Sequence, residues 1–301
     1  MTDLDAIVRA VLDELGKAGA PAPPEAVKAA TGAGGAALQE GSYRLDLSDL
    51  ATDEARAVAG VPNPSAPESL AELMGSTTAR IAVGRAGPRP RTRSLLLFQA
   101  DHGVAQDAIH GTVPEELRAS LGLFSVTTQA RDIEEYLLRP DLGRLLTDEA
   151  KATIRERCSP APQVQIVAAT GLSAAAINHN LPQLLPVVQQ GLTDAGVRLG
   201  TPFFIDFARV GVINDVGATL DADVVLILLG ERPGLGIPDA MSAYLGWRPR
   251  PGKTDAHREL LCMITERGGI NPLEAGAYVV DLVRSTLTAQ ASGVDRSGDE
   301  T

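Results

Sequence analysis

The feature that most constrains the fold is the run Val224–Leu229 (VVLILL), in which every residue is apolar. A strand that is apolar on both faces is typical of a parallel sheet covered by helices on both sides. Two more short apolar runs precede it, Val164–Ala169 (VQIVAA) and Pro202–Phe207 (PFFIDF), and helical segments separate the three. This alternation predicts an α/β domain with a parallel sheet.

The rest of the folded chain shows mainly helical periodicity. Helices are predicted at 92–110, 114–121, 131–138, 147–158, 174–191 and 272–290. The prolines of Ser159–Pro162 mark a plausible domain boundary. The sequence therefore predicts a mostly helical N-terminal region at 42–160, followed by a Rossmann-like three-layer α/β domain with a parallel sheet at 161–293. Residues 294–301 are expected to form a disordered tail.

The first 41 residues have a different composition. Residues 1–16 carry one apolar stripe at helical spacing, and residues 17–41 are rich in Ala, Pro and Gly, which is typical of a flexible linker. An amphipathic helix on such a tether either docks on a partner or folds back on the body of the protein. The sequence alone leaves both readings open.

Composition excludes several classes of protein. The chain has 38 acidic residues against 27 Lys plus Arg, which argues against general nucleic-acid binding. No apolar run is long enough to span a membrane, and no secretory signal is evident. Two cysteines, Cys158 and Cys262, are too few for a disulfide framework or a cysteine metal site. We expect a cytoplasmic protein.

A block of arginines stands out in this acidic chain. It lies in Thr78–Arg93 (TARIAVGRAGPRPRTR), which contains no acidic residue. Arginine suits carboxylates, phosphates and carbonyls, and the two prolines predict a stiff extended or turn segment at 87–90. The block is either a solvated basic loop, a short nucleic-acid arm or a contact surface for a partner. Its arginines are Arg80, Arg85, Arg89, Arg91 and Arg93.

Ligands in open parallel sheets bind outside the carboxyl ends of the strands. Three segments fall there: Thr170–Ser173, Asp206–Gly211 and Gly230–Gly236 (GERPGLG). Ser173 can cap the next helix, an ordinary structural role that also leaves N–H groups for a ligand. Glu231 can accept hydrogen bonds from ligand N–H groups, or it forms a weak surface pair with Arg232.

No catalytic or metal motif is recognisable in the sequence. The four histidines His102, His110, His179 and His257 are scattered, and GERPGLG does not match the dinucleotide-binding pattern G-x-G-x-x-G. Asp255-Ala256-His257 superficially fits D-x-H-x-x-G, a cobalt-ligand motif of cobalamin proteins, but Leu260 replaces the glycine. We therefore expect His257 to be a helix-face residue, and the chain to be a ligand-binding domain without a catalytic group of its own.

Three long segments carry a family resemblance: STTARIAVGRAGPRPRTRSLLLFQADHGVAQDAI, GTPFFIDFARVGVINDVGATL and VVLILLGERPGLG. They resemble the small subunit (light chain) of ethanolamine ammonia-lyase, over roughly Ser42 to Gly293. The resemblance implies an adenosylcobalamin-dependent lyase that converts ethanolamine to acetaldehyde and ammonia by a radical mechanism. It also implies a large catalytic subunit that holds the substrate, six copies of each subunit, and a cofactor bound between the two.

The resemblance further implies cobalamin contacts at Val210 and Glu231, and a third at a cysteine close after an arginine. Here that cysteine is shifted, so either Cys262 or its neighbours Leu260 and Leu261 fill the third position. No cobalt ligand and no catalytic residue are expected from this chain. The N-terminal helix also resembles a peptide that targets some family members to a bacterial microcompartment shell. The alternative is a non-catalytic α/β module that binds a small molecule or nucleotide, with the arginine block as an anion site.

Overall fold

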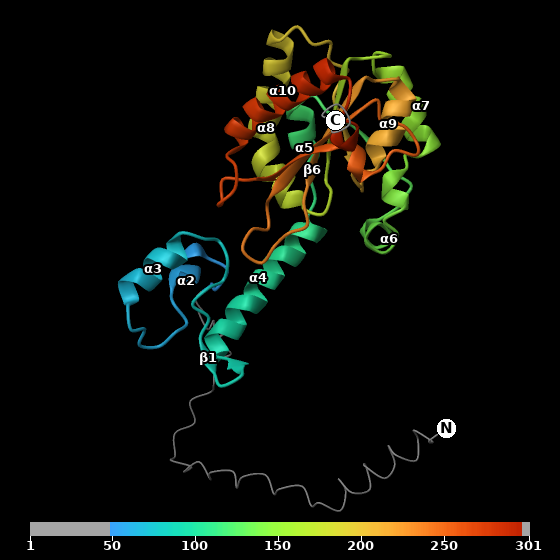
Figure 1. Ribbon diagram of the computed structural model, residues 1–301. Coiled ribbons are helices and arrows are strands. Elements are labelled where there is room, and N and C mark those ends of the chain that lie inside the picture. Colours follow the sequence, from blue (N-terminus) through green and yellow to red (C-terminus); the bar gives the residue numbers. More distant parts are fainter. Residues whose placement is uncertain (1–48, 297–301) are drawn as a thin grey trace, which may run out of the picture. The chain divides into compact units, whose positions relative to one another are not determined.

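The computed structural model describes residues 49–296 (Figure 1). The helix predicted for residues 1–16 and the linker predicted for 17–41 lie outside the described residues, as do residues 297–301 of the predicted tail. The first part of that tail is described. Gly293–Asp295 form the 3-10 helix η3, and Arg296 pairs with Glu259.

One mixed sheet forms the centre of the α/β part. Its strands are β3 (Phe124–Thr127), β4 (Val164–Ala169), β5 (Phe203–Asp206), β6 (Val224–Gly230), β7 (Met241–Trp247) and β8 (Glu259–Ile264). They lie in the order β3-β5-β4-β6-β7-β8; the first four are parallel, and β7 and β8 are antiparallel to their neighbours. All three predicted apolar runs are strands of the parallel part.

Helices cover both faces of this sheet (Figure 1). The longest of these are α7 (Asp148–Arg157), α8 (Ala174–Asp194), α9 (Val212–Leu220) and α10 (Pro272–Ala289). Helices α8 and α10 share a core with Leu226 and Leu228 of β6, whereas Val225 and Ile227 face the core on the side of α7 and α9. Successive residues of β6 thus point into two different cores, which is why none of them is polar. The predicted α/β class is confirmed.

The sheet contains strands from both sides of the predicted domain boundary near residue 160. Strand β3 precedes that position and pairs with β5 in parallel, with Phe124 opposite Phe203. Two short helices flank it, α5 (Glu115–Ser120) and α6 (Ile133–Leu138), and the 3-10 helix η1 (Leu142–Arg144) follows. Residues 124–157 therefore pack with the α/β part of the chain.

The arginine block lies among the first described elements. These are α2 (Asp53–Ala57), α3 (Pro67–Gly75), β1 (Arg85–Ala86), β2 (Arg89–Pro90) and α4 (Thr92–His110). Strands β1 and β2 form a two-residue hairpin, and Gly87 at its turn has φ of +61°. The predicted turn is confirmed, and its residues suit it: Gly adopts positive φ easily, and the Pro88 ring fixes its own φ. Within residues 49–296, no helix is both long and apolar enough to cross a membrane.

Buried Asp101 of α4 ties this region together. Its carboxylate accepts hydrogen bonds from Arg56 of α2, with distances of 3.2 and 3.1 Å, and from Arg80 Nε at 2.6 Å. Arg80, the first arginine of the block, is thus paired with a carboxylate of the same chain. In contrast, Arg85, Arg89, Arg91 and Arg93 are all exposed.

Candidate functional site

The three predicted loop segments meet at one edge of the sheet, around a pocket of about 280 Å³. It lies at the carboxyl ends of β4, β5 and β6. The topology explains its position: α8 leaves β4 toward one face, α9 leaves β5 toward the other, and the diverging loops open a crevice. The residues that line it are Tyr136, Gly171, Leu172, Arg209, Val210, Leu229, Gly230, Glu231, Arg232 and Tyr244.

The loop after β4 is fixed by its capping serine. Ser173 Oγ accepts a hydrogen bond from the Ala176 amide at 3.1 Å and donates one to the Pro238 carbonyl at 2.7 Å. Gly171 has φ of +61°, and a Cβ there would lie 2.1 Å from the Gly230 carbonyl oxygen. A Cβ at Gly230 would lie 2.2 Å from the Ser173 carbonyl oxygen, so glycine at both positions lets the loops after β4 and β6 pack against each other.

Val210 is carried by a braced loop after β5. The Tyr136 hydroxyl donates a hydrogen bond to the Ala208 carbonyl at 2.9 Å, and the guanidinium of Arg209 lies 4.2 Å from the Tyr136 ring centre. Arg209 also donates to the Tyr136 carbonyl at 3.0 Å. Phe207 has φ of +57°, a strained value for a bulky residue that is often found beside functional sites.

Glu231 follows directly after β6 and lines the same pocket as Val210. Burial raises the pKa of Glu231, and a hydrogen bond from the Met263 backbone opposes that rise. Met263 itself has φ of +59°. Tyr244 of β7 lies close by, and its pKa is raised by burial and then by the charges of Glu231 and Cys262. The Glu231 carboxylate thus presents an acceptor in a half-buried setting, and the predicted surface pair with Arg232 is not among the ion pairs of the described residues.

Leu260, Leu261 and Cys262, the three candidates for the third predicted cobalamin contact, have different surroundings in the structure. Strand β8 has one more residue than β7 between the pairs Met241–Ile264 and Ala243–Leu261, which is a β-bulge. Leu261 packs on the core of α8 and α10. Leu260 is paired with Tyr244, so it shares the face on which Tyr244 lines the pocket, and by alternation Cys262 points to that face too. Cys262 is exposed and does not itself line the pocket. Its role stays a prediction, as do those of Val210 and Glu231.

Sequence reasoning missed three residues of this site: Tyr136, Arg209 and Tyr244. Arg209 lies inside the predicted segment, but nothing in the sequence distinguishes it from a surface arginine. Tyr136 comes from α6, some seventy positions before its partner Ala208. No sequence pattern connects segments so far apart.

Histidines do not gather at this edge. In residues 49–296 no group of three His, Cys, Asp or Glu side chains is placed to hold a metal ion. His257 ends a single 3-10 turn, η2 (Asp255–His257), and its Nδ1 accepts a hydrogen bond from the Thr254 amide at 3.1 Å. His179 pairs with Asp239 at 2.9 Å, away from the pocket.

A comparison with known protein families identifies the family of this chain. The sequence model of the ethanolamine ammonia-lyase light chain (EutC) family matches residues 67–296. The chain belongs to the ethanolamine ammonia-lyase light chain family. The match includes every strand of the sheet and every residue that lines the pocket. The light chain is the small subunit of a carbon–nitrogen lyase, so this chain has a large subunit as its partner.

The side chains that line the pocket are both polar and apolar. Its side chains can accept or donate hydrogen bonds and can pack against an apolar surface. They do not pair a nucleophile with a base in the part of the chain that the structure describes.

Proposed function

We propose that this chain binds one edge of adenosylcobalamin at the pocket formed by Val210 and Glu231. In this proposal it serves as the cofactor-binding small subunit of an enzyme that converts ethanolamine to acetaldehyde and ammonia. The observation that carries the proposal is the meeting of Val210 and Glu231 in one crevice, in a chain of the light chain family.

The residues present fit a corrinoid. A corrin ring is apolar on its faces and edged by neutral amides, which need hydrogen-bond acceptors. The pocket offers an apolar wall with Leu172 and Val210, and Glu231 supplies the acceptor. Its volume of about 280 Å³ is far too small for a whole corrinoid. The chain would hold only an edge, and the large subunit would cover the rest.

Each residue has a separate task in this proposal. Glu231 accepts a hydrogen bond from an amide and so fixes the orientation of the ring. Val210 packs against the ring and excludes water, while Tyr136 and Arg209 hold its loop in place. Bound adenosylcobalamin supplies the radical chemistry. The substrate is held by the large subunit.

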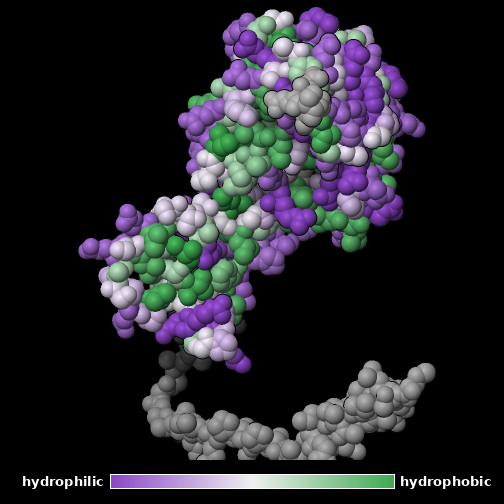
Figure 2. Space-filling view, in the orientation of Figure 1, coloured by the Kyte–Doolittle hydropathy of each residue, from purple (hydrophilic) through white to green (hydrophobic). Residues whose placement is uncertain are grey.

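An exposed surface near the arginine block suits the large subunit. Figure 2 shows a broad hydrophobic area over α2, α3 and the start of α4. Exposed arginines adjoin it, so a partner with an apolar surface edged by carboxylates would fit here. The exposed apolar side chains are Val58, Val61, Leu73, Ile81, Leu95 and Leu96.

The test compares Glu231→Gln with Glu156→Gln, an exposed glutamate of α7 outside the pocket. Each full chain is combined with the large subunit, and the affinity for hydroxocobalamin is measured by its visible spectrum. We expect Glu231→Gln to weaken binding by about tenfold, because a charged acceptor is lost. The proposal fails if Glu231→Gln binds like the wild type, or if acetaldehyde release from ethanolamine does not require adenosylcobalamin.

A further inference from the structure

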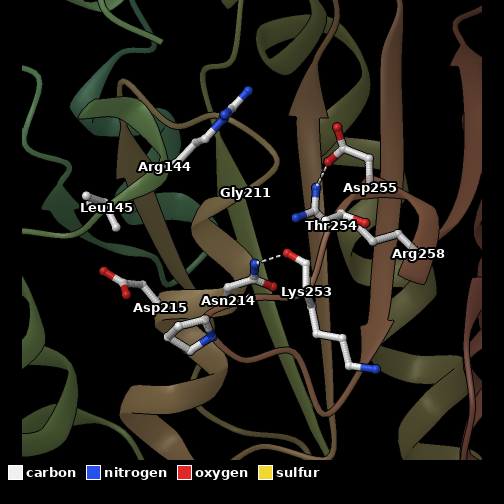
Figure 3. Close-up of a pocket in the computed structure, with 11 residues that line it drawn as sticks. Arg144, Leu145, Gly211, Asn214, Asp215, Lys253, Thr254, Asp255 and Arg258 are labelled. Carbon is white, nitrogen blue, oxygen red and sulfur yellow. Dashed lines mark hydrogen bonds and ion pairs between the residues drawn. The ribbon is translucent and has the colours of Figure 1, made fainter. Parts of the chain in front are cut away.

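A second pocket, of about 370 Å³, is lined by Gly211, the residue that follows Val210 (Figure 3). Val210 lines the first pocket and Gly211 lines the second, so the two pockets are neighbours along the chain. Its walls come from η1, from the first turn of α9, and from the segment between β7 and β8. The residues are Arg144, Leu145, Gly211, Asn214, Asp215, Pro251, Gly252, Lys253, Thr254, Asp255 and Arg258.

Arg258 is a buried cation with an incomplete set of partners. Its side chain is 5% exposed, and its one ion pair is with Asp255, whose side chain is 87% exposed. The Nε of Arg258 has no hydrogen-bond partner among the described residues. In Figure 3 its guanidinium points from the Asp255 side into the space between that side and Gly211. A buried N–H donor without an acceptor is costly, so the site favours an added acceptor.

Arg144 adds a second positive charge to the pocket. Its side-chain stem packs on Gly211, where a Cβ would lie 2.8 Å from Arg144 Cγ. Within residues 49–296 Arg144 makes no ion pair. Burial lowers the pKa of Arg258, the charge of Asp255 opposes this, and the charge of Arg144 adds to it. Two guanidiniums that repel each other across a pocket favour an anion between them.

The other charged groups of the pocket are already paired. Asp215 accepts a hydrogen bond from the Leu146 amide at 2.9 Å and lies 3.0 Å from Lys151 Nζ, and Lys253 pairs with Asp295 at 2.7 Å. Asn214 donates to the Lys253 carbonyl at 2.8 Å, and its Oδ1 has no partner in the described part of the chain. The charge left without a counterion is therefore that of Arg144.

We propose that this pocket binds a phosphate group, with Arg144 and Arg258 as the anion ligands. Planar guanidiniums match the geometry of phosphate oxygens, and charge-assisted hydrogen bonds of this kind are strong. The free acceptor of Asn214 suits a hydroxyl, which a protonated phosphate or a group next to it would supply. The phosphate group comes from one of two molecules. The first is free phosphate. The second is the phosphodiester of the cobalamin nucleotide tail, and this alternative rests on the proposed function.

The first arm of the test uses inorganic phosphate and the full chain. The melting temperature is measured in phosphate and in chloride at equal ionic strength. We expect phosphate to raise the melting temperature of the wild type and of the control Arg155→Gln, an exposed arginine of α7. The increase should be lost in Arg144→Gln and in Arg258→Gln. If the buried Arg258 variant does not fold, the Arg144 variant decides this arm alone.

The second arm uses the complex with the large subunit and compares cobalamin with cobinamide, which lacks the nucleotide tail. If the tail is the source, Arg144→Gln should weaken cobalamin binding by about tenfold and leave cobinamide binding unchanged. If free phosphate is the source, only the first arm responds. The proposal is overturned if Arg144→Gln changes neither the phosphate response nor the preference for cobalamin. A wild-type complex that binds no corrinoid contradicts the proposed function, and the phosphate arm still decides this one.

Discussion

Tyr136 shows how much of the candidate site depends on one buried residue. Its hydroxyl donates to the Ala208 carbonyl at 2.9 Å, its ring supports Arg209, and burial raises its pKa from 10.0 to about 12. Tyr136→Phe removes the donor and leaves the Ala208 carbonyl without it. We expect the free energy of unfolding, measured in urea, to fall by about 1–2 kcal/mol. Tyr278→Phe, at an exposed tyrosine, should change it little.

The raised pKa of Tyr136 predicts that the free energy of unfolding depends on pH. Because the folded-state pKa of Tyr136 is raised, the folded protein keeps a proton that the unfolded chain loses. This stabilisation is fully present below pH 10 and is lost as pH rises toward 12. The difference in unfolding free energy between the wild type and Tyr136→Phe should therefore shrink over that range. A difference that stays constant from pH 9 to 12 would show that the hydroxyl titrates like an exposed tyrosine.

At the level of elements, α2 and the segment before β1 are held to α4 through Asp101. The Asp101 side chain has no exposed surface, while Arg56 and Arg80 are 13% and 17% exposed. Asp101→Asn leaves two largely buried arginines without their carboxylate, which costs roughly 3 kcal/mol for a buried pair. We expect faster amide hydrogen exchange in residues 53–81, with little change in the sheet.

The matched control is Asp107→Asn, at an exposed position of the same helix without an ion pair in the described residues. It changes the charge of α4 by the same amount. If both variants exchange alike in residues 53–81, Asp101 does not hold these elements in place.

The elements that sequence reasoning predicted best are those with a strong local pattern. Helices α4, α8 and α10 have long amphipathic or apolar faces, and β4, β5 and β6 are apolar because helices cover both their faces. Strand β8 was missed because its sequence, ELLCMI, does not alternate between polar and apolar residues, and because a bulge interrupts its pairing with β7. Strand β3 is as short as β5, but two of its four residues, Ser125 and Thr127, are polar, so it lacks the continuous apolar run that marks β5.

The candidate site could be predicted in position but not in detail. Loops after β4, β5 and β6 must meet if the sheet is parallel, and this brought Val210 and Glu231 together. The order of strands across the sheet depends on long-range pairing, which no local pattern records. For the same reason the sequence did not show that Arg144 and Arg258 face one pocket, since more than one hundred residues separate them.

For the whole molecule, the remaining question is how the arginine block contributes to assembly. Arg80 is committed to Asp101, whereas Arg89 and Arg91 sit at the exposed hairpin and at the start of α4. Neither side chain makes an ion pair or hydrogen bond with another described residue. Replacing them should therefore leave the fold intact and act on contacts with the large subunit.

We expect the double variant Arg89→Ala/Arg91→Ala to lower the affinity for the large subunit by about thirtyfold or more, because interface arginines that contribute to binding are worth about 1–2 kcal/mol each. Sedimentation velocity of mixed subunits at several salt concentrations measures this. Arg155→Ala/Arg284→Ala removes the same charge from exposed positions of α7 and α10 and should assemble normally. Full assembly of the hairpin variant with reduced turnover would place these arginines at the cofactor instead. Equal losses in both double variants would show that only net charge matters.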